Sequence, residues 1–371
     1  MWPARPAAPT TTGRLSTSDL LGQVRIALDL MGGESAPEAI VDGALCAALE
    51  QPGLHIVLVG SAEVAARLVG DRPGSDRVSY VEATETIGME EDPIRAVRAK
   101  RHSSVRVAAT LVRTGAADAF VSAGSTGATV AAGLFTLGRV RGMARAGLAV
   151  VVPAAAGPVI LLDAGASPVA SPDVMCQFAQ AGSAYARIRL GSKAPLVGLL
   201  SIGAEAGKGD ALRKRSYDAL SRLAGISFVG NVEGGDVAAG GRADVVVTDG
   251  FTGNVLLKGM EGAVAMATAA LASAIGFDPA LQVAAGLLRP AFDAAAASID
   301  PEQHGGGLLL GVNGVVVVAH GATTPRALAA SVAVAADAVR AEVVSAVTAA
   351  MTSSLRAHMV AGLAARVGQR T

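Results

Sequence analysis

The sequence predicts an α/β protein of 371 residues, in which short buried strands alternate with longer helices. Runs of β-branched and other apolar residues recur from Val24 onward, which is typical of strands buried on both faces. Stretches with helical periodicity separate these runs. Gly, Ser, Asn and Asp follow most of the apolar runs, as expected where a strand ends in a turn.

Ten runs are predicted to be strands: 24–28, 55–60, 78–83, 119–124, 148–152, 158–163, 196–203, 226–232, 244–250 and 315–320. The main predicted helices are 37–50, 125–140, 172–190, 210–223 and 325–352. Ten strands are many for one sheet, so we expect either a long sheet or two subdomains that share a cleft.

The composition is that of a globular protein with a large core, since 51% of residues are apolar and 17% are charged. The formal net charge is zero, which disfavours a general nucleic-acid binder. Cys46 and Cys176 are far apart and belong to no metal-binding motif, so we expect buried thiols in a reducing compartment. Residues 1–22 lack the apolar stretch of a secretory signal and are predicted to be a disordered extension.

Residues 254–298 form a long apolar helical stretch, predicted to be two helices that part near 276–279. A dimer or core helix pair is one interpretation, because apolar helices are usually buried in protein. An apolar hairpin that touches a bilayer is the other. The charge-free residues 262–277 are too few for a bilayer span, so no transmembrane helix is predicted.

Six strands are followed by turns rich in Gly, Ser, Asn and Asp, and such turns gather at the carboxyl edge of an open α/β sheet, where ligands bind. Glycine lets the backbone approach a ligand, and the next helix start favours an anion such as phosphate. The strongest example is SAGSTGA, residues 122–128, although a simple helix cap would have the same residues. GAEAGKG, residues 203–209, fails as a Walker A loop, but Lys208 could hold phosphate or remain a solvated lysine.

His320 ends a predicted strand beside glycine and is the candidate proton carrier, with a structural histidine as the alternative. No two histidines have metal-ligand spacing, so no metal site is predicted. No Gly-x-Ser-x-Gly elbow occurs, so a covalent acyl-enzyme is not the preferred mechanism.

From DLMGGESAPEAIVDGA onward, the chain resembles the bacterial phosphate acyltransferases that make acyl phosphate from acyl-acyl carrier protein. The similarity continues through SAGSTGA, LDAGAS, GLLSIGAEAGKG, FVGNVEG, ADVVVTDGFTGNVLLK and HGGGLLLGVNGVVVVAHG. Ser125 and Ser167 stand where this family usually has Asn. The resemblance covers residues 23–371 as one phosphate acyltransferase domain, with the helical pair at 254–298.

The resemblance implies a three-layer αβα sandwich of the isocitrate and isopropylmalate dehydrogenase type. It also implies a cytoplasmic homodimer without cofactor, bound peripherally to the membrane beside the glycerol-phosphate acyltransferase that uses the product. Its partners would be acyl-acyl carrier protein and inorganic phosphate, with no nucleic acid.

On this basis phosphate attacks the thioester directly, held near SAGSTGA, Lys208 and the helix start at Gly253–Asn254. The candidate catalytic residues are Lys208, His320 and Asn254. The candidate phosphate- or substrate-binding residues are Asp29, Gly32, Gly33, Ser122, Gly124, Ser125, Thr126, Gly127, Asp163, Gly165, Glu205, Asn231, Asp249, Gly253 and Lys258.

Three alternatives remain open from the sequence. A phosphotransacetylase that uses acyl-coenzyme A would share the fold class and the chemistry. A dehydrogenase of the related fold would need nicotinamide and usually a metal, but no acidic metal cluster is evident. A non-catalytic scaffold that binds lipid or carrier protein would keep the fold without turnover.

Overall fold

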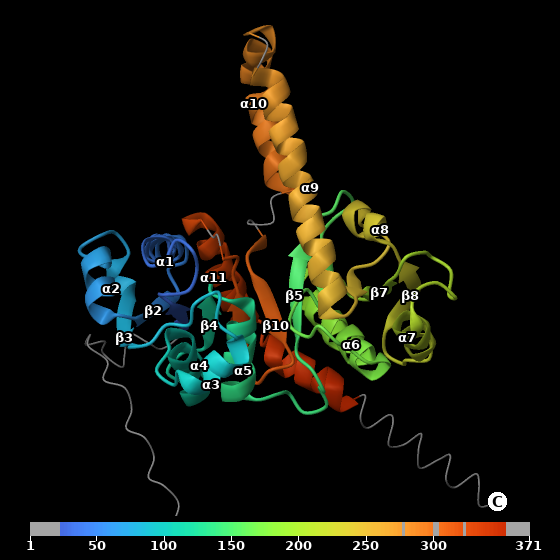
Figure 1. Ribbon diagram of the computed structural model, residues 1–371, viewed down its shortest axis with the longest axis horizontal. Helices are drawn as coiled ribbons and strands as arrows, with labels where there is room; N and C mark the ends of the chain where they lie inside the picture. The colour runs from blue at the N-terminus through green and yellow to red at the C-terminus, as the bar shows by residue number, and fades with distance from the viewer. Residues whose placement is uncertain (1–22, 277–278, 300–303, 322–323, 354–371) are drawn as a thin grey trace, which may run out of the picture. The chain divides into compact units, whose positions relative to one another are not determined.

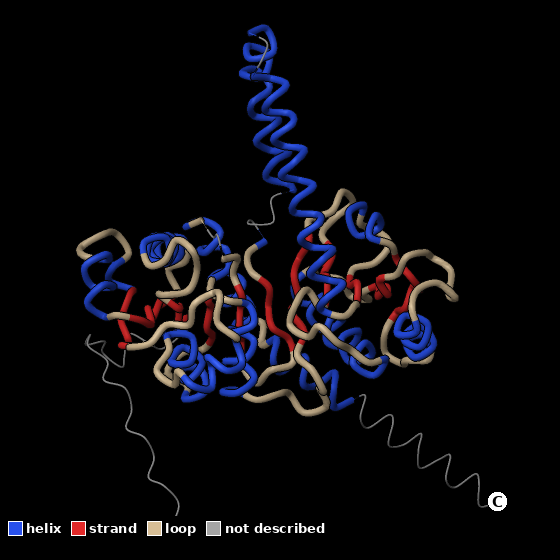
Figure 2. Tube along the Cα trace, viewed as in Figure 1, coloured by secondary structure: helices blue, strands red, loops and turns tan. Residues whose placement is uncertain are grey.

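The computed structural model describes residues 23–276, 279–299, 304–321 and 324–353, so the predicted extension 1–22 lies outside the described residues. The chain divides into two compact units. Of the described residues, those within 23–139 and 305–344 form unit 1, and those within 140–304 and 345–353 form unit 2. In each unit, strands lie between helices, as predicted for an α/β protein (Figure 2).

Unit 1 has a mainly parallel sheet with the strand order β3-β2-β1-β4-β11-β10, in which only β10 is antiparallel to its neighbour β11. Its strands are β1 (Val24–Asp29), β2 (Leu54–Gly60), β3 (Val78–Glu82), β4 (Ala119–Ser122), β10 (Gly307–Leu310) and β11 (Val315–Val318). Its helices are α1 (Glu38–Glu50), α2 (Ala62–Val69), α3 (Pro93–Ala99), α4 (Ser104–Thr114), α5 (Thr126–Leu137) and α11 (Pro325–Arg340).

Helices cover both faces of the unit 1 sheet. α1 and α11 pack on one face and α3, α4 and α5 on the other (Figure 1). Ile26, Leu28, Ile56, Leu58 and Phe120 are fully buried between these layers. The near-continuous apolar strands predicted this double burial, because a parallel sheet needs helices on both faces.

Unit 2 has the strand order β5-β6-β9-β7-β8, with β5 antiparallel to β6 and the other neighbours parallel. Its strands are β5 (Gly147–Val152), β6 (Val159–Leu162), β7 (Leu196–Leu200), β8 (Ser227–Val232) and β9 (Val245–Val247). Its helices are α6 (Pro172–Arg189), α7 (Ala211–Ser221), α8 (Gly234–Ala239), α9 (Gly250–Gly276) and α10 (Pro279–Ile299).

The start of α9 packs on the unit 2 sheet, where Leu256, Leu257 and Met260 contact a core that includes Val152 and Leu161. The rest of α9 runs beside α10 with its side chains largely exposed (Figure 1). By length and composition, α9 is long and apolar enough to cross a membrane, and the apolar window that meets this test is not buried. The sequence analysis considered only the charge-free residues 262–277, whereas the helix itself runs over Gly250–Gly276.

Three sequence-based details are wrong. The predicted helix 325–352 is interrupted: α11 ends at Arg340, and Glu342 has a positive φ before the next helix, Val343–Ser353. Cys46 and Cys176 are half-buried rather than buried, because each lies at the margin of its helix's packed face. The prediction also missed several elements, namely α2, α3, α4, α8 and β10.

Candidate functional site

In unit 1, the turn after β1 and the turn after β4 are joined by the buried side chain of Asp29. The Ser122 hydroxyl donates to Asp29 Oδ2 at 2.7 Å, and the Met31 N–H donates to Oδ1 at 3.2 Å. Burial raises the pKa of Asp29, and the hydrogen bonds from Ser104, Ser122 and Met31 only partly oppose this effect. Asp29 therefore fixes the two turns and is not itself open to a ligand.

Glycine is required where these turns meet. A Cβ at Gly32 would lie 2.7 Å from the Gly124 nitrogen and 2.8 Å from Asp29 Oδ2. Gly33 has φ +111° and packs beside the carbonyl oxygens of Ala123 and Gly321. The structure thus brings together the predicted turns at Gly32, Gly33 and Ser122–Gly124, and it adds the turn at Gly321 that follows His320.

The start of α5 is a candidate anion-binding element of unit 1, where Gly127 is exposed. Ser125 caps the helix, as predicted, because its hydroxyl accepts from the Ala128 N–H at 3.5 Å. Thr126 and Gly127 are the first two helical residues, and their N–H groups have no acceptor within the helix. Such N–H groups, together with the helix dipole, favour a bound anion. His320 is exposed at the same carboxyl edge, just after β11.

In unit 2, Asp163 holds the turn after β6 by accepting four backbone hydrogen bonds. The donors are the N–H groups of Leu148, Gly165, Ala166 and Ser167, at 2.7–2.9 Å. Burial raises the pKa of Asp163, while these four bonds act in the opposite direction. Like Asp29, Asp163 shapes a turn and has no accessible carboxylate, so we interpret both residues as supports of the turns.

The start of α9 lies against this turn. A Cβ at Gly253 would overlap the Asp163 carbonyl oxygen, and a Cβ at Gly165 would lie 3.6 Å from Asn254 Cγ. Gly253 must therefore be glycine for the helix start to approach the turn so closely, whereas Gly165 is favoured by its φ of +142°. Asn254 is itself exposed, so its amide is available to a ligand at this edge.

A buried ion pair that the sequence analysis missed fixes the same helix start. The Arg213 guanidinium binds the Asp249 carboxylate and donates to Thr248 Oγ1 at 3.1 Å and Thr252 Oγ1 at 2.9 Å. Asp249 in turn accepts from the Thr252 N–H at 2.9 Å. Burial alone would raise the pKa of Asp249, but the bonds from Thr252 and the charge of Arg213 hold it below its ordinary value. Asp249, predicted to bind substrate, is thus occupied in capping α9.

The Lys208 turn lies between β7 and α7. The Lys208 N–H donates to the Glu205 carbonyl at 3.0 Å, and the buried Asn231 side chain donates to the same carbonyl at 2.7 Å. Asn231 Oδ1 is buried and has no hydrogen-bond partner among the described residues. Lys208 and Glu205 are exposed, which leaves the ammonium accessible. Asn231 therefore supports the turn that presents Lys208.

The predicted anion ligand Lys258 is exposed on α9, one turn beyond Asn254, and it pairs with Glu261 at 2.8 Å. Its charge is therefore partly neutralised by its own helix. Among the residues that the structure describes, no group of His, Cys, Asp and Glu could hold a metal ion.

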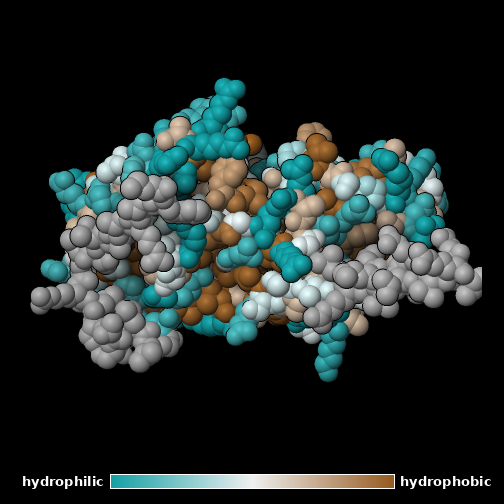
Figure 3. Space-filling model, turned by 90° about the horizontal axis from the view of Figure 1, so that it is seen from below, coloured by the Kyte–Doolittle hydropathy of each residue, from teal (hydrophilic) through white to brown (hydrophobic). Residues whose placement is uncertain are grey.

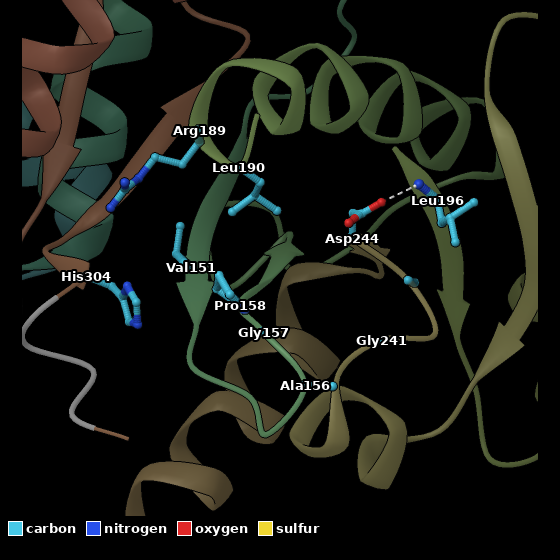
Figure 4. Close-up of a pocket in the computed structure, with 11 residues that line it drawn as sticks. Val151, Ala156, Gly157, Pro158, Arg189, Leu190, Leu196, Gly241, Asp244 and His304 are labelled. Carbon is cyan, nitrogen blue, oxygen red and sulfur yellow. Dashed lines mark hydrogen bonds between the residues drawn. The ribbon is translucent and has the colours of Figure 1, made fainter. Parts of the chain in front are cut away.

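A cavity of about 390 Å³ lies at the opposite, amino edge of the unit 2 strands (Figure 4). Pro158, Leu196 and Asp244 line it where β6, β7 and β9 begin, and Asp244 accepts from the Leu196 N–H at 2.7 Å. Arg189 and Leu190 reach it from the end of α6. None of the predicted site residues lines this cavity, so the candidate site remains at the carboxyl-edge turns.

An α/β fold whose parallel strands end in glycine-rich turns beside helix starts is the class of protein suited to binding phosphate or a similar anion. Comparisons with known proteins identify the family within this class. The model of the family described as "Fatty acid synthesis protein" matches residues 24–346. The phosphate acyltransferase of Desulfitobacterium hafniense is 42% identical over 316 residues, covering 85% of this chain and 94% of that protein. The phosphate acyltransferase of Thermobifida fusca is 44% identical, covering 82% of this chain and 84% of that protein.

This chain therefore belongs to the phosphate acyltransferase family of fatty acid and phospholipid synthesis, and it is an acyltransferase. Two solved structures show the same fold. A phosphotransacetylase from Streptococcus pyogenes matches with a TM-score of 0.57 and 16% identity, covering 88% of this chain and 99% of that one. A branched-chain phosphotransacylase from Enterococcus faecalis V583 matches with a TM-score of 0.53 and 16% identity, covering 85% and 99%.

Proposed function

We propose that this enzyme transfers the acyl group of an acyl-acyl carrier protein to inorganic phosphate, giving acyl phosphate for phosphatidic acid synthesis. The observation that carries the proposal is the open start of α5, where the N–H groups of Thr126 and Gly127 have no acceptor within the helix. Membership of the phosphate acyltransferase family supplies the reaction class. The proposal adds to this reaction class the identity of the donor, an acyl-acyl carrier protein, and of the product, acyl phosphate.

In the proposed reaction, a phosphate oxygen attacks the carbonyl carbon of the thioester, so that a C–O bond forms and the C–S bond breaks. The thiolate leaves and takes up a proton to become the free carrier thiol. No enzyme nucleophile is needed, because phosphate attacks directly. The chain's task is to position the anion and to offset the negative charge that develops on the carbonyl oxygen.

Groups with suitable chemistry occur at the carboxyl-edge turns of unit 1 and, separately, of unit 2. In unit 1, the N–H groups at the start of α5 bind an anion, and the exposed His320 moves a proton. In unit 2, the exposed ammonium of Lys208 offsets negative charge, and the amide of Asn254 donates a hydrogen bond. Asp29, Asp163 and Asp249 do not touch substrate in this proposal, because their carboxylates bind the turns and the start of α9. Asn231 is fully buried and supports the Lys208 turn.

The test is acyl phosphate formation from palmitoyl-acyl carrier protein and labelled phosphate by Lys208→Ala. We expect the rate to fall by about 10²-fold or more if the ammonium stabilises developing charge. Lys214→Ala is the matched control, because Lys214 is an exposed lysine on the adjacent α7. Lys208→Ala with unchanged turnover would remove this residue from the mechanism. If the wild-type enzyme uses palmitoyl-coenzyme A but not the carrier thioester, the donor is acyl-coenzyme A and the proposed donor is wrong.

We further propose that the enzyme is a homodimer that binds membranes peripherally through α9 and α10. Large apolar side chains on these helices are exposed, including Met266, Leu271, Val283 and Leu287. Leu271→Asp should reduce flotation with phospholipid vesicles, because burying a charge in the apolar interface is costly. Leu49→Asp on α1 is the control, since Leu49 is 51% exposed and Leu271 is 49% exposed. Loss of the dimer in gel filtration with intact vesicle binding would assign this face to the subunit interface instead.

A further inference from the structure

A cationic surface lies on α3, α4 and the short connection between them in unit 1. Residues 93–114 contain five arginines, one lysine and one histidine, but no aspartate or glutamate. The chain as a whole is neutral, so this local excess of positive charge is a specific feature. We call the five arginines, which are Arg95, Arg98, Arg101, Arg106 and Arg113, the arginine surface.

Among the described residues, no carboxylate forms an ion pair with the arginine surface, and the neighbouring Asp92 and Glu85 accept backbone hydrogen bonds from Arg95 and His102. Lys100 pairs with Glu91 at 2.6 Å, but none of the five arginines lies within ion-pair distance of a carboxylate among the described residues. Arg106 donates to the Val97 carbonyl at 2.9 Å, while its Nε is buried without a hydrogen-bond partner. Burial lowers the pKa of Arg106, and the nearby charges of Arg101 and Arg113 lower it further. The guanidinium groups of the arginine surface thus lie close together although their charges repel each other. A ligand that carries carboxylates would reduce this repulsion.

Apolar side chains are exposed among these cations. The Arg98 guanidinium stacks on the Phe135 ring, 4.8 Å from its centroid. Phe135 is nevertheless 45% exposed, and Ile94 on α3 is 51% exposed. The face seen in Figure 3 likewise mixes hydrophilic and hydrophobic side chains. Arginine and aromatic residues are enriched in protein–protein interfaces, where lysine is depleted.

The arginine surface is connected to the candidate anion site of unit 1. Pro93, the first residue of α3, packs against Gly127 at the start of α5. Arg98, near the end of α3, packs against Phe135 farther along α5. The rise of 1.5 Å per residue places Phe135 about 12 Å from Gly127 along the helix. A partner bound at Arg98 would therefore lie within reach of the α5 start through a flexible arm of that length.

We propose that the arginine surface docks a carboxylate-rich face of the carrier protein that presents the acyl thioester. This inference rests on the proposed function, because it identifies where the donor of that reaction binds. Arg98, Arg101 and Arg113 would pair with carboxylates through their planar guanidinium groups. Phe135 and Ile94 would contact apolar side chains between those carboxylates. The docked carrier would place its thioester arm toward the start of α5.

The test compares two double variants with the same change in charge. Arg101→Glu/Arg113→Glu reverses two exposed arginines that make no hydrogen bond among the described residues, so the fold should be retained. Arg187→Glu/Arg222→Glu is the control, because both arginines are exposed on unit 2. Circular dichroism and thermal unfolding would establish that both variants are folded.

Binding of carrier protein without an acyl group is measured first, by calorimetry or fluorescence anisotropy, so that the result does not depend on turnover. We expect Kd to rise about tenfold or more for Arg101→Glu/Arg113→Glu and less than about twofold for the control. Wild-type binding should weaken with added salt, and the salt dependence should be smaller in the Arg101→Glu/Arg113→Glu variant. Equal Kd values in all three proteins, or no binding to the wild type, would overturn the docking proposal.

Kinetics separate docking from chemistry. For Arg101→Glu/Arg113→Glu we expect KM for acyl carrier protein to rise about tenfold with kcat nearly unchanged, because the cations act at a distance from the reacting atoms. Turnover of acyl-pantetheine, which lacks the carrier, should not change. Wild type that binds the carrier but does not convert its thioester would refute the proposed function and leave the docking surface standing. Weaker binding to phosphatidylglycerol vesicles with unchanged carrier binding would assign the arginine surface to the membrane and overturn the proposal.

Discussion

Replacing Arg213 by methionine should destabilise unit 2, because it leaves the Asp249 carboxylate buried without a cation. The side chains of Arg213 and Asp249 are only 10% and 8% exposed. Removing one partner of such a pair costs about 3–5 kcal/mol, since the remaining charge is left uncompensated. Arg213→Met also removes hydrogen bonds to Thr248 and Thr252. We therefore expect a loss toward the upper part of this range.

The loss should depend on pH in a defined direction. The folded-state pKa of Asp249 in the wild type lies below its ordinary value. Its stabilisation is therefore present above the unfolded pKa, about 3.9, and is lost as the pH falls through the folded pKa. In Arg213→Met, burial without the guanidinium would raise the pKa of Asp249, so that the destabilisation is relieved once this carboxyl is protonated. The difference between variant and wild type should thus shrink from pH 7 toward pH 4.

The assay is urea unfolding followed by far-UV circular dichroism at pH 7 and pH 4.5, with hydrogen exchange to locate the loss in unit 2. Arg213→Met/Asp249→Asn should recover much of the stability, because asparagine is neutral and can still cap α9. Two results would refute this account of the pair. One is a loss below about 1 kcal/mol at pH 7; the other is a double variant no more stable than Arg213→Met.

Two further predictions concern packing and thiol reactivity. Gly253→Ala should destabilise the protein by about 1–3 kcal/mol, because its Cβ would overlap a backbone carbonyl. Gly259 on the same helix has open space around it, so Gly259→Ala should stabilise the protein by up to about 1 kcal/mol. Urea unfolding of both variants measures this difference, and equal stabilities would contradict the packing described here. Burial raises the pKa of Cys176 to about 11, so at pH 8 roughly one thiol in a thousand is ionised. Iodoacetamide should therefore label native Cys176 far more slowly than the unfolded chain, and comparable rates would show that burial does not control this thiol.

Helix starts and turn positions were predictable from the sequence because both depend on local chemistry. Ser125 and Ser171 cap α5 and α6, since a short side-chain oxygen accepts an N–H group of the first turn. The small helices α3 and α8 were not predicted, because seven and six residues are too short to establish a periodic pattern. The interruption after Arg340 was also missed, because Glu342 adopts a positive φ that its residue type does not favour.

Part of the candidate site was also predictable from local sequence, and part depended on tertiary contacts. Glycine-rich turns indicated an anion-binding edge, and the structure places Lys208 exposed in such a turn and Asn254 exposed near the start of α9. The predicted roles of Asp29 and Asp163 changed, because the structure shows both carboxylates buried and bonded to the turns themselves. A carboxylate after a strand has the same local sequence whether it faces a ligand or the backbone.

The sequence by itself determined the alternation of strands and helices, the turns at the strand ends and, through its motifs, the family. These features depend on residues close together in the chain. The tertiary structure decided which distant groups meet, such as Ser122 with Asp29 across 93 positions and Asp249 with Arg213 across 36. It also decided that, within the part of the chain that the structure describes, the five arginines of the arginine surface form no ion pair with a carboxylate. Such contacts follow from strand order and helix packing. The residues next to each side chain in the sequence do not indicate which distant side chain it will contact.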